Sequence, residues 1–311
     1  MRLVFLGSGD FAVPSLLALV DAGHEVAALV TQPDREKGRG QALAPPPTKP
    51  VAESRKVSVL QFRKVRDPEA QQALRALRPE LQVVVAFGQI LPRPVIDIPP
   101  LGTVNLHASL LPLLRGAAPV QWAIATGQTE TGVSTMLIDE GLDTGPILLR
   151  RALAIGPEET AAELSPRLAA LGASLLVETI EGLAAGALVP QPQDHARATL
   201  APILKKEDGR VDWALPAKTI ANRARGFTPW PGAFTFHEGR LLKLVRVRPV
   251  EAAGAAATKP GEVLEVRPEV VVACGGGTRL RLLEVQPESR RPMPSSAWAA
   301  GARVVPGRRL D

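Results

Sequence analysis

The sequence predicts an α/β domain with an open, mostly parallel sheet and helices on both faces, followed by a small β-barrel. Three observations predict this fold. Residues 2–6 form an apolar run that leads into a glycine-rich turn, an apolar helix and a second apolar run at 24–30. Residues 81–87 are almost entirely apolar, as a parallel strand that is buried on both faces should be. About five short β-like runs follow residue 232, which favours a small barrel.

The remaining elements of the first part alternate between helix and strand patterns. Alternation of this kind predicts βαβ units and therefore a Rossmann-like sheet. In the longest expected helix, leucines recur at helical spacing, which indicates packing against the sheet. The expected helices lie at 49–56, 67–77, 120–126 and 159–183, and the further strands at 57–60 and 132–138.

The chain of 311 residues is long for a single hydrophobic core, so two domains are expected. Proline, glycine and polar residues accumulate after residue 186, as in a connector. We therefore predict a first domain at 1–186, a linker at 187–207 and a barrel domain at 208–311. Residues 1–207 carry 20 Lys and Arg against 21 Asp and Glu, whereas 208–311 carry 17 against 10. This basic surplus predicts contact with a polyanion or, more simply, an arginine-rich solvated face.

The sequence also excludes several kinds of site and location. Cys274 is the single cysteine, so an internal disulfide and a cysteine-based metal site are excluded. His24, His195 and His237 lack metal-ligand spacing, and no metal is expected. No apolar run approaches the roughly 18 residues that span a bilayer, and residues 1–7 resemble a first strand rather than a signal peptide. A cytoplasmic protein is therefore expected.

The stretch from 102 to 146 contains the strongest candidate for a reactive site. Asn105 and His107 lie two residues apart in an apolar run, and the period of a strand places both on one face. A second β-like run then breaks into a glycine-flanked loop with three carboxylates, of which Asp143 is the last. An amide donor, an imidazole and a carboxylate suit acyl or formyl transfer to an amine. A capped turn with a hydrogen-bonded histidine is the alternative.

Two motifs around these residues resemble the signature of the formyltetrahydrofolate-dependent formyltransferases. They are Asn105-Leu106-His107-Ala108-Ser109-Leu110-Leu111-Pro112, continued by Arg115-Gly116-Ala117-Ala118-Pro119, and Asp139-Glu140-Gly141-Leu142-Asp143-Thr144-Gly145. The resemblance implies 10-formyltetrahydrofolate as the formyl-donating cosubstrate, a cleft for its pteridine ring, a C-terminal barrel of the oligonucleotide-binding type and no metal. Carried over by position, the folate-binding residues are Gln89, Ile90, Leu91, Ser109, Leu110, Leu111, Pro112, Ile138, Asp139 and Gly141.

Within this family the chain is similar to members that act on initiator tRNA charged with methionine. Gln32-Pro33-Asp34-Arg35 and Gly38-Arg39-Gly40 resemble an insertion that reaches the acceptor end of that tRNA. Segments 201–213 and 220–234 resemble the linker and the start of the C-terminal domain of these members. A surface loop with incidental charge is the simpler interpretation of the insertion. The residues expected to bind tRNA are Lys37, Arg39, Lys205, Lys206, Arg223, Lys243, Arg246 and Arg248.

The last three of these residues lie on one expected strand, but Lys243 is out of phase with the two arginines. The alternation of a strand therefore does not require a single basic face there.

The resemblance also implies a reaction. The α-amine of methionine on the tRNA attacks the formyl carbon, which yields N-formylmethionyl-tRNA and tetrahydrofolate for translation initiation. Asn105 would donate a hydrogen bond to the developing oxyanion. His107 would act near the same oxygen or donate a proton to the leaving nitrogen, and Asp143 would favour the charged form of His107 and help to remove the amine proton. A monomer is expected.

Three other functions remain open from the sequence. The same chemistry could serve another amine, such as that of an amino-sugar nucleotide. Gly7-Ser8-Gly9-Asp10-Phe11-Ala12 nearly matches the dinucleotide fingerprint, and Asp34 lies near the position of a ribose-binding acid, which would make an NAD-binding oxidoreductase. A long basic loop after the second strand argues against that interpretation. An RNA-binding module without activity is disfavoured because Asn105, His107 and Asp143 are all present.

Overall fold

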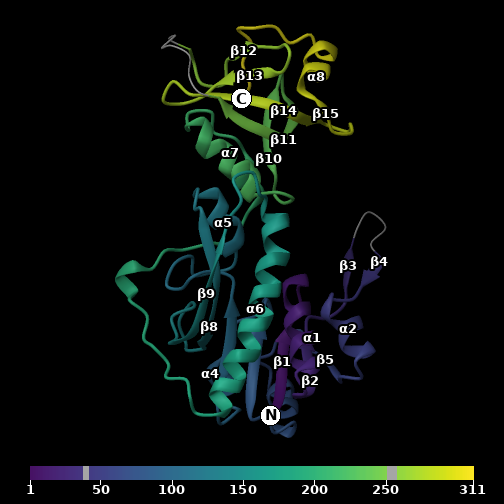
Figure 1. Ribbon diagram of the computed structural model, residues 1–311. Coiled ribbons are helices and arrows are strands. Elements are labelled where there is room, and N and C mark those ends of the chain that lie inside the picture. The colour runs from purple at the N-terminus through teal and green to yellow at the C-terminus, as the bar shows by residue number, and fades with distance from the viewer. Residues whose placement is uncertain (38–41, 251–257) are drawn as a thin grey trace. The chain divides into compact units, whose positions relative to one another are not determined.

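The computed structural model describes residues 1–37, 42–250 and 258–311, which form two compact units (Figure 1). What we call the N-terminal unit consists of three segments: Met1–Pro119, Glu130–Ala154 and Ser165–Ala201. What we call the C-terminal unit consists of Val120–Thr129, Ile155–Leu164 and Pro202–Asp311. Each unit is therefore assembled from separate stretches of the chain, and the domain boundaries expected from the sequence stay a prediction.

A seven-stranded sheet forms the centre of the N-terminal unit. Its first five strands are parallel and its last two pairings are antiparallel, so the predicted mostly parallel sheet is confirmed. The chain proceeds outward from β1 to β5 and then returns to β6 on the other side of β1; open sheets bind ligands beside such a switch point. In spatial order the strands are β5 (Val59–Gln61), β2 (Glu25–Thr31), β1 (Arg2–Gly7), β6 (Leu81–Val85), β7 (Thr103–His107), β8 (Glu130–Leu137) and β9 (Ile147–Ala154).

Helices cover both faces of this sheet. On one face, Val84 of β6 packs in one apolar cluster with Leu74 of α3. On the opposite face, the backbone of Gly172 in α6 lies against the Leu106 side chain of β7. In the part of the chain that the structure describes, no helix is long and apolar enough to cross a membrane. The helices of the N-terminal unit are α1 (Val13–Asp21), α2 (Thr48–Ser54), α3 (Pro68–Ala76), α4 (Arg93–Ile96) and α6 (Ala161–Ala184) from Ser165 onward, and its hairpin consists of β3 (Arg35–Lys37) and β4 (Ala42–Ala44). All of α5 (Pro119–Ala125) except its first residue belongs to the C-terminal unit.

The C-terminal unit is an antiparallel sheet whose two edge strands both bond the segment 307–311. The amide of Val263 in β12 donates to the oxygen of Arg308 at 2.8 Å, and Phe236 of β10 exchanges two backbone hydrogen bonds with Asp311. This segment thus curls the sheet toward closure, in agreement with the predicted small barrel. The unit contains β10 (Ala233–His237), β11 (Arg240–Val250), β14 (Arg279–Pro287), β13 (Val270–Ala273), β12 (Val263–Glu265), β15 (Met293–Pro294), α7 (Ala217–Gly226) and α8 (Ser295–Gly301).

A β-bulge in β11 places three basic side chains on the outer face of this sheet. The register between β11 and β14 shifts between Leu244 and Arg246, which inserts one additional residue into β11. Leu242 and Leu244 are buried in the core, whereas Lys243, Arg246 and Arg248 are exposed. In a regular strand Lys243 would face the opposite side from the two arginines. The additional residue in the bulge brings all three side chains to the same face.

Candidate active site

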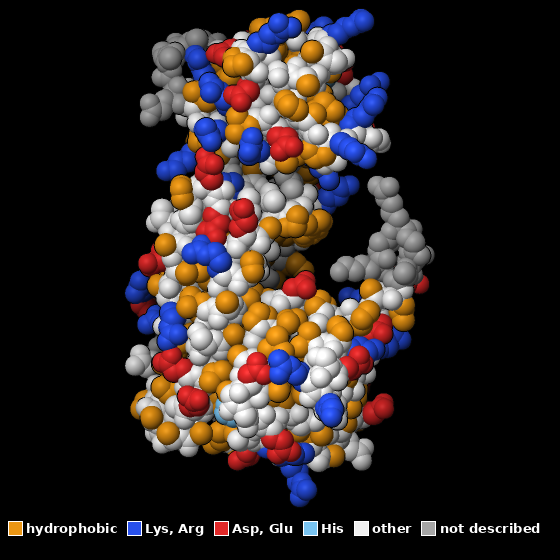
Figure 2. All heavy atoms as spheres, turned by 45° about the vertical axis from the view of Figure 1, so that its right-hand side comes forward, with side chains coloured by type: hydrophobic (Ala, Val, Ile, Leu, Met, Phe, Trp, Pro, Cys, Tyr) orange, Lys and Arg blue, Asp and Glu red, His pale blue; other side chains and the backbone are white. Residues whose placement is uncertain are grey.

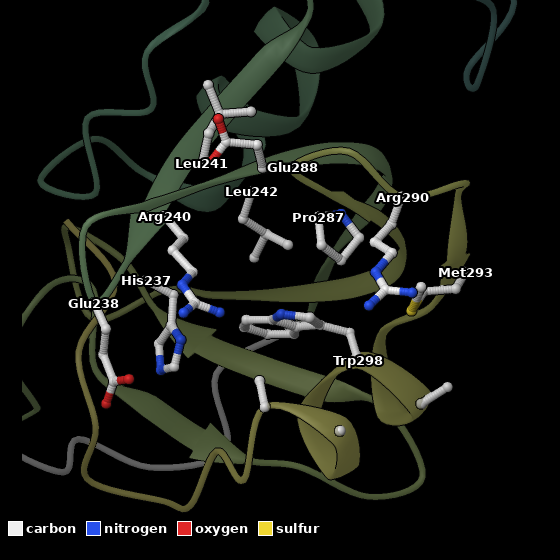
Figure 3. Close-up of a pocket in the computed structure, with 13 residues that line it drawn as sticks. His237, Glu238, Arg240, Leu241, Leu242, Pro287, Glu288, Arg290, Met293 and Trp298 are labelled. Atoms are coloured by element: carbon white, nitrogen blue, oxygen red, sulfur yellow. The ribbon is translucent and has the colours of Figure 1, made fainter.

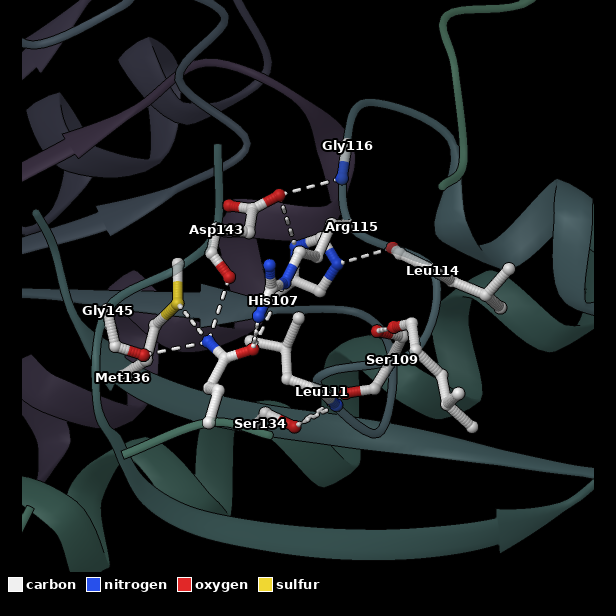
Figure 4. Close-up of polar contacts among 12 residues, drawn as sticks. His107, Ser109, Leu111, Leu114, Arg115, Gly116, Ser134, Met136, Asp143 and Gly145 are labelled. Atoms are coloured by element: carbon white, nitrogen blue, oxygen red, sulfur yellow. Dashed lines mark hydrogen bonds and ion pairs between the residues drawn. The ribbon is translucent and has the colours of Figure 1, made fainter. Parts of the chain in front are cut away.

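His107 ends β7, and its two ring nitrogens face different groups (Figure 4). Its side chain is 6% exposed. The Nε2 atom lies 2.9 Å from the main-chain oxygen of Leu114, and because a carbonyl can only accept, Nε2 carries the hydrogen. The Nδ1 atom lies 3.6 Å from Oδ2 of Asp143, which is longer than a hydrogen bond. Nδ1 is therefore the ring nitrogen that remains available to a substrate, and it faces a carboxylate.

Asp143 reaches His107 because the loop after β8 runs back along the sheet. β8 is antiparallel to β7, so it ends beside the start of β7, where the amide of Ile138 donates to the oxygen of Thr103 at 2.8 Å. His107 lies at the other end of β7, and the loop spans that length. The amide of Gly116 donates to Oδ2 of Asp143 at 2.8 Å. The carboxylate is thus held by a hydrogen bond from a neighbouring loop.

The loop between β8 and β9 is ordered by its own polar side chains. Oδ1 of Asp139 accepts a hydrogen bond from the amide of Gly141 at 3.0 Å and another from the hydroxyl of Thr144 at 2.6 Å. Asp143 adopts a φ of 51°, in the left-handed region that few residues other than glycine occupy. Asp139 and Gly141, which were predicted to bind folate, therefore shape the loop that carries Asp143.

Asn105 lies on the same face of β7 as His107 and is half-buried. It is in register with Val84 of β6 on one side and with Met136 of β8 on the other. Its carboxamide has no hydrogen-bond partner within the described ranges of the chain. An unpaired amide donor beside an imidazole is free to donate to a developing oxyanion.

The sequence did not single out two side chains that support this site, Arg115 and Gln193. Both are 6% exposed. Gln193 comes from the segment that was predicted to be a linker, yet it hydrogen-bonds the backbone of the Asp143 loop. Its sequence surroundings are polar and proline-rich, and they carry no periodic pattern from which its burial could be recognised.

Two of the residues predicted to bind folate have polar side chains that are engaged within the protein. Oε1 of Gln89 accepts a hydrogen bond from the amide of Val65 at 2.7 Å, and its Nε2 donates to the oxygen of Phe62 at 3.2 Å. The hydroxyl of Ser109 donates to the oxygen of Leu113 at 2.5 Å. The polar side-chain groups at these two positions are therefore committed within the protein, and the main-chain oxygen of Ser109 also accepts a hydrogen bond from the hydroxyl of Ser134 at 2.7 Å.

The apolar residues of the same set differ in exposure. Leu111 and Pro112 are buried, and Leu111 packs with Met136 in a small core cluster. Leu91 and Ile138 are partly buried against one apolar cluster, and Leu110 is half-buried. Ile90 is 93% exposed, and Leu142 of the Asp143 loop, which was not predicted, is 62% exposed. Ile90 and Leu142 are thus the apolar side chains most open to contact with a ligand.

The glycine-rich turn after β1 is not arranged to bind a dinucleotide. The amides of Ser8 and Gly9 both point at the oxygen of Ala86, at 3.3 Å and 3.4 Å, so they are not free to bind a pyrophosphate. Asp34, the candidate ribose acid, binds elsewhere: hydrogen bonds from Gln61 and then from Lys49 lower the pKa of its carboxyl. These contacts argue against the NAD-binding interpretation.

The residues predicted to bind tRNA fall into three groups. Lys205 and Lys206 are exposed, as are Lys243, Arg246 and Arg248 on the outer face of β11. Arg223 is half-buried: it donates to the oxygen of Asp208 at 3.0 Å and lies over the ring of Phe227. Arg248 forms an exposed ion pair with Glu158 at 2.9 Å. Arg39 lies outside the described residues, and Lys37 ends β3, where its backbone alone is described.

A cavity of about 520 Å³ lies in the C-terminal unit beside α8 (Figure 3). Arg240 and Arg290 flank it, and Trp298, which is 6% exposed, lines it next to His237. No residue predicted for catalysis, folate or tRNA lines this cavity.

Within the described residues, no group of three or more His, Cys, Asp or Glu could hold a metal ion. Burial raises the pKa of the Cys274 thiol to about 12, so this thiol is protonated near neutrality.

Gly145 tests the path of the Asp143 loop. A Cβ at this position would lie 1.8 Å from the main-chain oxygen of Leu137, which is a severe overlap. We expect Gly145→Ala to lower the free energy of unfolding by about 1–3 kcal/mol, as overpacking does. The control is Gly301→Ala, where an added Cβ meets nothing within 4 Å. Equal stability of both variants in urea unfolding would contradict the loop path.

Comparison with known proteins identifies the family of the chain. Two family models match the chain: formyl transferase over residues 1–180 and formyl transferase, C-terminal domain, over residues 203–303. Two relatives named methionyl-tRNA formyltransferase cover 100% of this chain. The one from Solibacter usitatus is 56% identical and covered over 98% of its length, and the one from Geobacter sulfurreducens is 50% identical and covered over 96%.

Solved structures share the fold at low identity. The N-formyltransferase from Helicobacter canadensis, solved with folinic acid and dTDP-3-aminofucose, has a TM-score of 0.68 at 17% identity, covering 91% of this chain and 98% of its own. HypX from Aquifex aeolicus, solved with tetrahydrofolic acid, has a TM-score of 0.62 at 20% identity. The match covers 96% of this chain and 47% of the HypX chain, so this chain spans about half the length of HypX. The family models and the full-length relatives together confirm the family that the motifs indicated: the chain belongs to the formyl transferase family.

Proposed function

We propose that this chain transfers the formyl group of 10-formyltetrahydrofolate to the α-amine of methionine on initiator tRNA. The products are N-formylmethionyl-tRNA and tetrahydrofolate, and the first of them serves translation initiation. The observation that carries the proposal is the placement of Asn105, His107 and Asp143 in a chain that is 56% identical, over its whole length, to a relative named methionyl-tRNA formyltransferase. We further propose that the enzyme acts in the cytoplasm, as its role in translation requires, and that it is a monomer.

The chemistry follows from the available groups. The neutral amine of methionine attacks the formyl carbon, a C–N bond forms, and the carbonyl electron pair moves to the oxygen. The carboxamide of Asn105 donates to that oxygen. The amine then loses a proton to the Asp143 carboxylate, directly or through water. The protonated Asp143 passes this proton to Nδ1 of His107, which carries no hydrogen in the neutral ring because Nε2 is committed to Leu114. Collapse of the intermediate then breaks the bond to N10 of the folate, and N10 takes the proton from Nδ1.

The donor would bind along the loops after β6 and β8. Ile90 and Leu142 are exposed apolar side chains on these two loops, and burial of such surface by an aromatic pteridine is favourable. Leu91 and Ile138 pack beneath the loops in one cluster, which keeps the loops in place. We retain the loop from Ser109 to Pro112 in the donor site. Its oxygens at Ser109 and Leu111 accept hydrogen bonds within the protein, so the half-buried Leu110 side chain is the part of the loop open to the donor. We retain Gln89, Asp139 and Gly141 in this proposal through their backbone.

The tRNA would bind through basic side chains that remain exposed. Three of them, Lys243, Arg246 and Arg248, lie on β11. The other two, Lys205 and Lys206, lie near the start of the segment Pro202–Asp311. Exposed lysine and arginine side chains attract phosphate groups and release counterions on binding. We also include Lys37, Arg39 and Arg223 among the residues proposed to bind tRNA. The guanidinium group of Arg223 lies over the ring of Phe227.

Formyl transfer can be measured directly with labelled 10-formyltetrahydrofolate. We expect label to move to methionine-charged initiator tRNA at least about 10²-fold faster than to methionine-charged elongator tRNA, a ratio well below the 10⁴ to 10⁵ that hydrogen-bonded recognition can reach. Free methionine should accept none. Equal transfer to both tRNAs would contradict the initiator assignment. Transfer to an amino-sugar nucleotide, with none to either tRNA, would assign the site to that amine.

The three proposed catalytic side chains can be tested by truncation. Asn105→Ala should lower kcat by about 10² to 10³, as loss of an oxyanion donor does. His107→Ala and Asp143→Ala should each lower kcat by about 10² to 10⁴ through lost acid–base catalysis. Thermal unfolding serves to check that the variants fold. The matched control is Asp21→Ala, which removes only an exposed ion pair with Arg55; normal turnover in any of the three site variants would remove that residue from the mechanism.

A further inference from the structure

The Gln193 side chain joins the two loops that surround His107 and Asp143 (Figure 4 shows its partners). Its Oε1 accepts hydrogen bonds from Nε and Nη2 of Arg115, at 3.1 Å and 2.6 Å. Its Nε2 donates to the main-chain oxygens of Asp143 and Gly145, at 2.8 Å and 2.7 Å. The side chain is 6% exposed, so the whole carboxamide is used within the protein.

These partners determine the orientation of the carboxamide. A guanidinium group can only donate and a main-chain oxygen can only accept, so a flipped carboxamide would oppose like groups at both ends. A buried polar network in which every member is paired holds its members in one arrangement. Gln193 therefore connects the backbone at Asp143 rigidly to Arg115.

Arg115 carries this connection to the other side of the Asp143 carboxylate. Its backbone amide donates to the oxygen of Thr199 at 2.8 Å, and its Nη2 lies 3.2 Å from Nδ1 of His195. The next residue, Gly116, donates its amide to the Asp143 carboxylate at 2.8 Å. The backbone of Asp143 and one partner of its carboxylate thus both depend on the segment from Gln193 to Thr199.

We propose that Gln193 is a positioning residue for the formyl transfer. It holds Asp143 in its left-handed backbone conformation, with the carboxylate facing Nδ1 of His107, and it acts on the reaction only through Asp143. The inference rests on the proposed function. It concerns a side chain that touches no reacting atom, in a stretch that otherwise resembles a connector.

The first test replaces Gln193 and a matched glutamine. Gln193→Met keeps the length of the side chain and removes both polar atoms, whereas Gln193→Glu keeps the acceptor for Arg115 and removes the donor. We expect both to lower kcat by about 10²-fold, as displacement of a catalytic group by about 1 Å does, with KM for tRNA and folate changed less than about twofold. The control Gln191→Met, two residues away on an exposed side chain, should match the wild type.

The second test asks whether Gln193 acts through Asp143. In an Asp143→Asn background, Gln193→Glu should lower kcat further by less than about threefold, because the group that Gln193 positions is already disabled. Equal losses in the two backgrounds would overturn the inference, since an effect on folding or on another group would be additive. Thermal unfolding of each variant measures the structural contribution separately.

Failure of this inference is distinguishable from failure of the proposed function. If the wild type formylates initiator tRNA and Gln193→Glu does so at the same kcat, the positioning role is wrong and the function stands. If the wild type transfers formyl to another amine, the same cycle is measured with that amine. Unchanged KM with reduced kcat supports the inference, and a rise in KM alone contradicts it.

Discussion

The hydrogen bond between His107 Nε2 and the main-chain oxygen of Leu114 constrains the chemistry of the site more than any other contact. At 2.9 Å it commits one ring nitrogen to a fixed acceptor and turns the other toward Asp143. The separation of 3.6 Å between Nδ1 and the carboxylate is too long for a hydrogen bond, so Nδ1 is left unbonded, yet it is short enough for a small movement to let a proton pass between the two groups. A single imidazole is thereby anchored by one nitrogen and reactive through the other.

This arrangement depends on three segments that are far apart in the sequence. β7 supplies Asn105 and His107, and the loop after β8 returns along the length of β7 to deliver Asp143. The segment from Gln193 to Ala201 then closes the site from a third side. The amide of Leu114 donates to the hydroxyl of Thr199 at 2.8 Å, so the residue that anchors His107 is itself anchored by this segment.

Much of the fold and part of the site could be predicted from the sequence. The continuous apolar run predicted the buried strand β6. The alternation of side chains along a strand predicted that Asn105 and His107 share one face of β7. The bulge in β11 could not be predicted, because Lys243 and Arg246 break the period that strand prediction assumes. Gln193 could not be predicted either, because its burial arises from contacts about 50 and 78 residues away along the chain.

The protonation of His107 tests the central claim most directly. Nitrogen NMR of a labelled sample, with the signals of His107 assigned by their loss in His107→Gln, reports which ring nitrogen carries hydrogen. The account predicts that Nε2 carries hydrogen and that Nδ1 of the neutral ring does not. A neutral ring with hydrogen on Nδ1 and a bare Nε2 would contradict the anchoring by Leu114 and the assignment of Nδ1 as the reactive nitrogen.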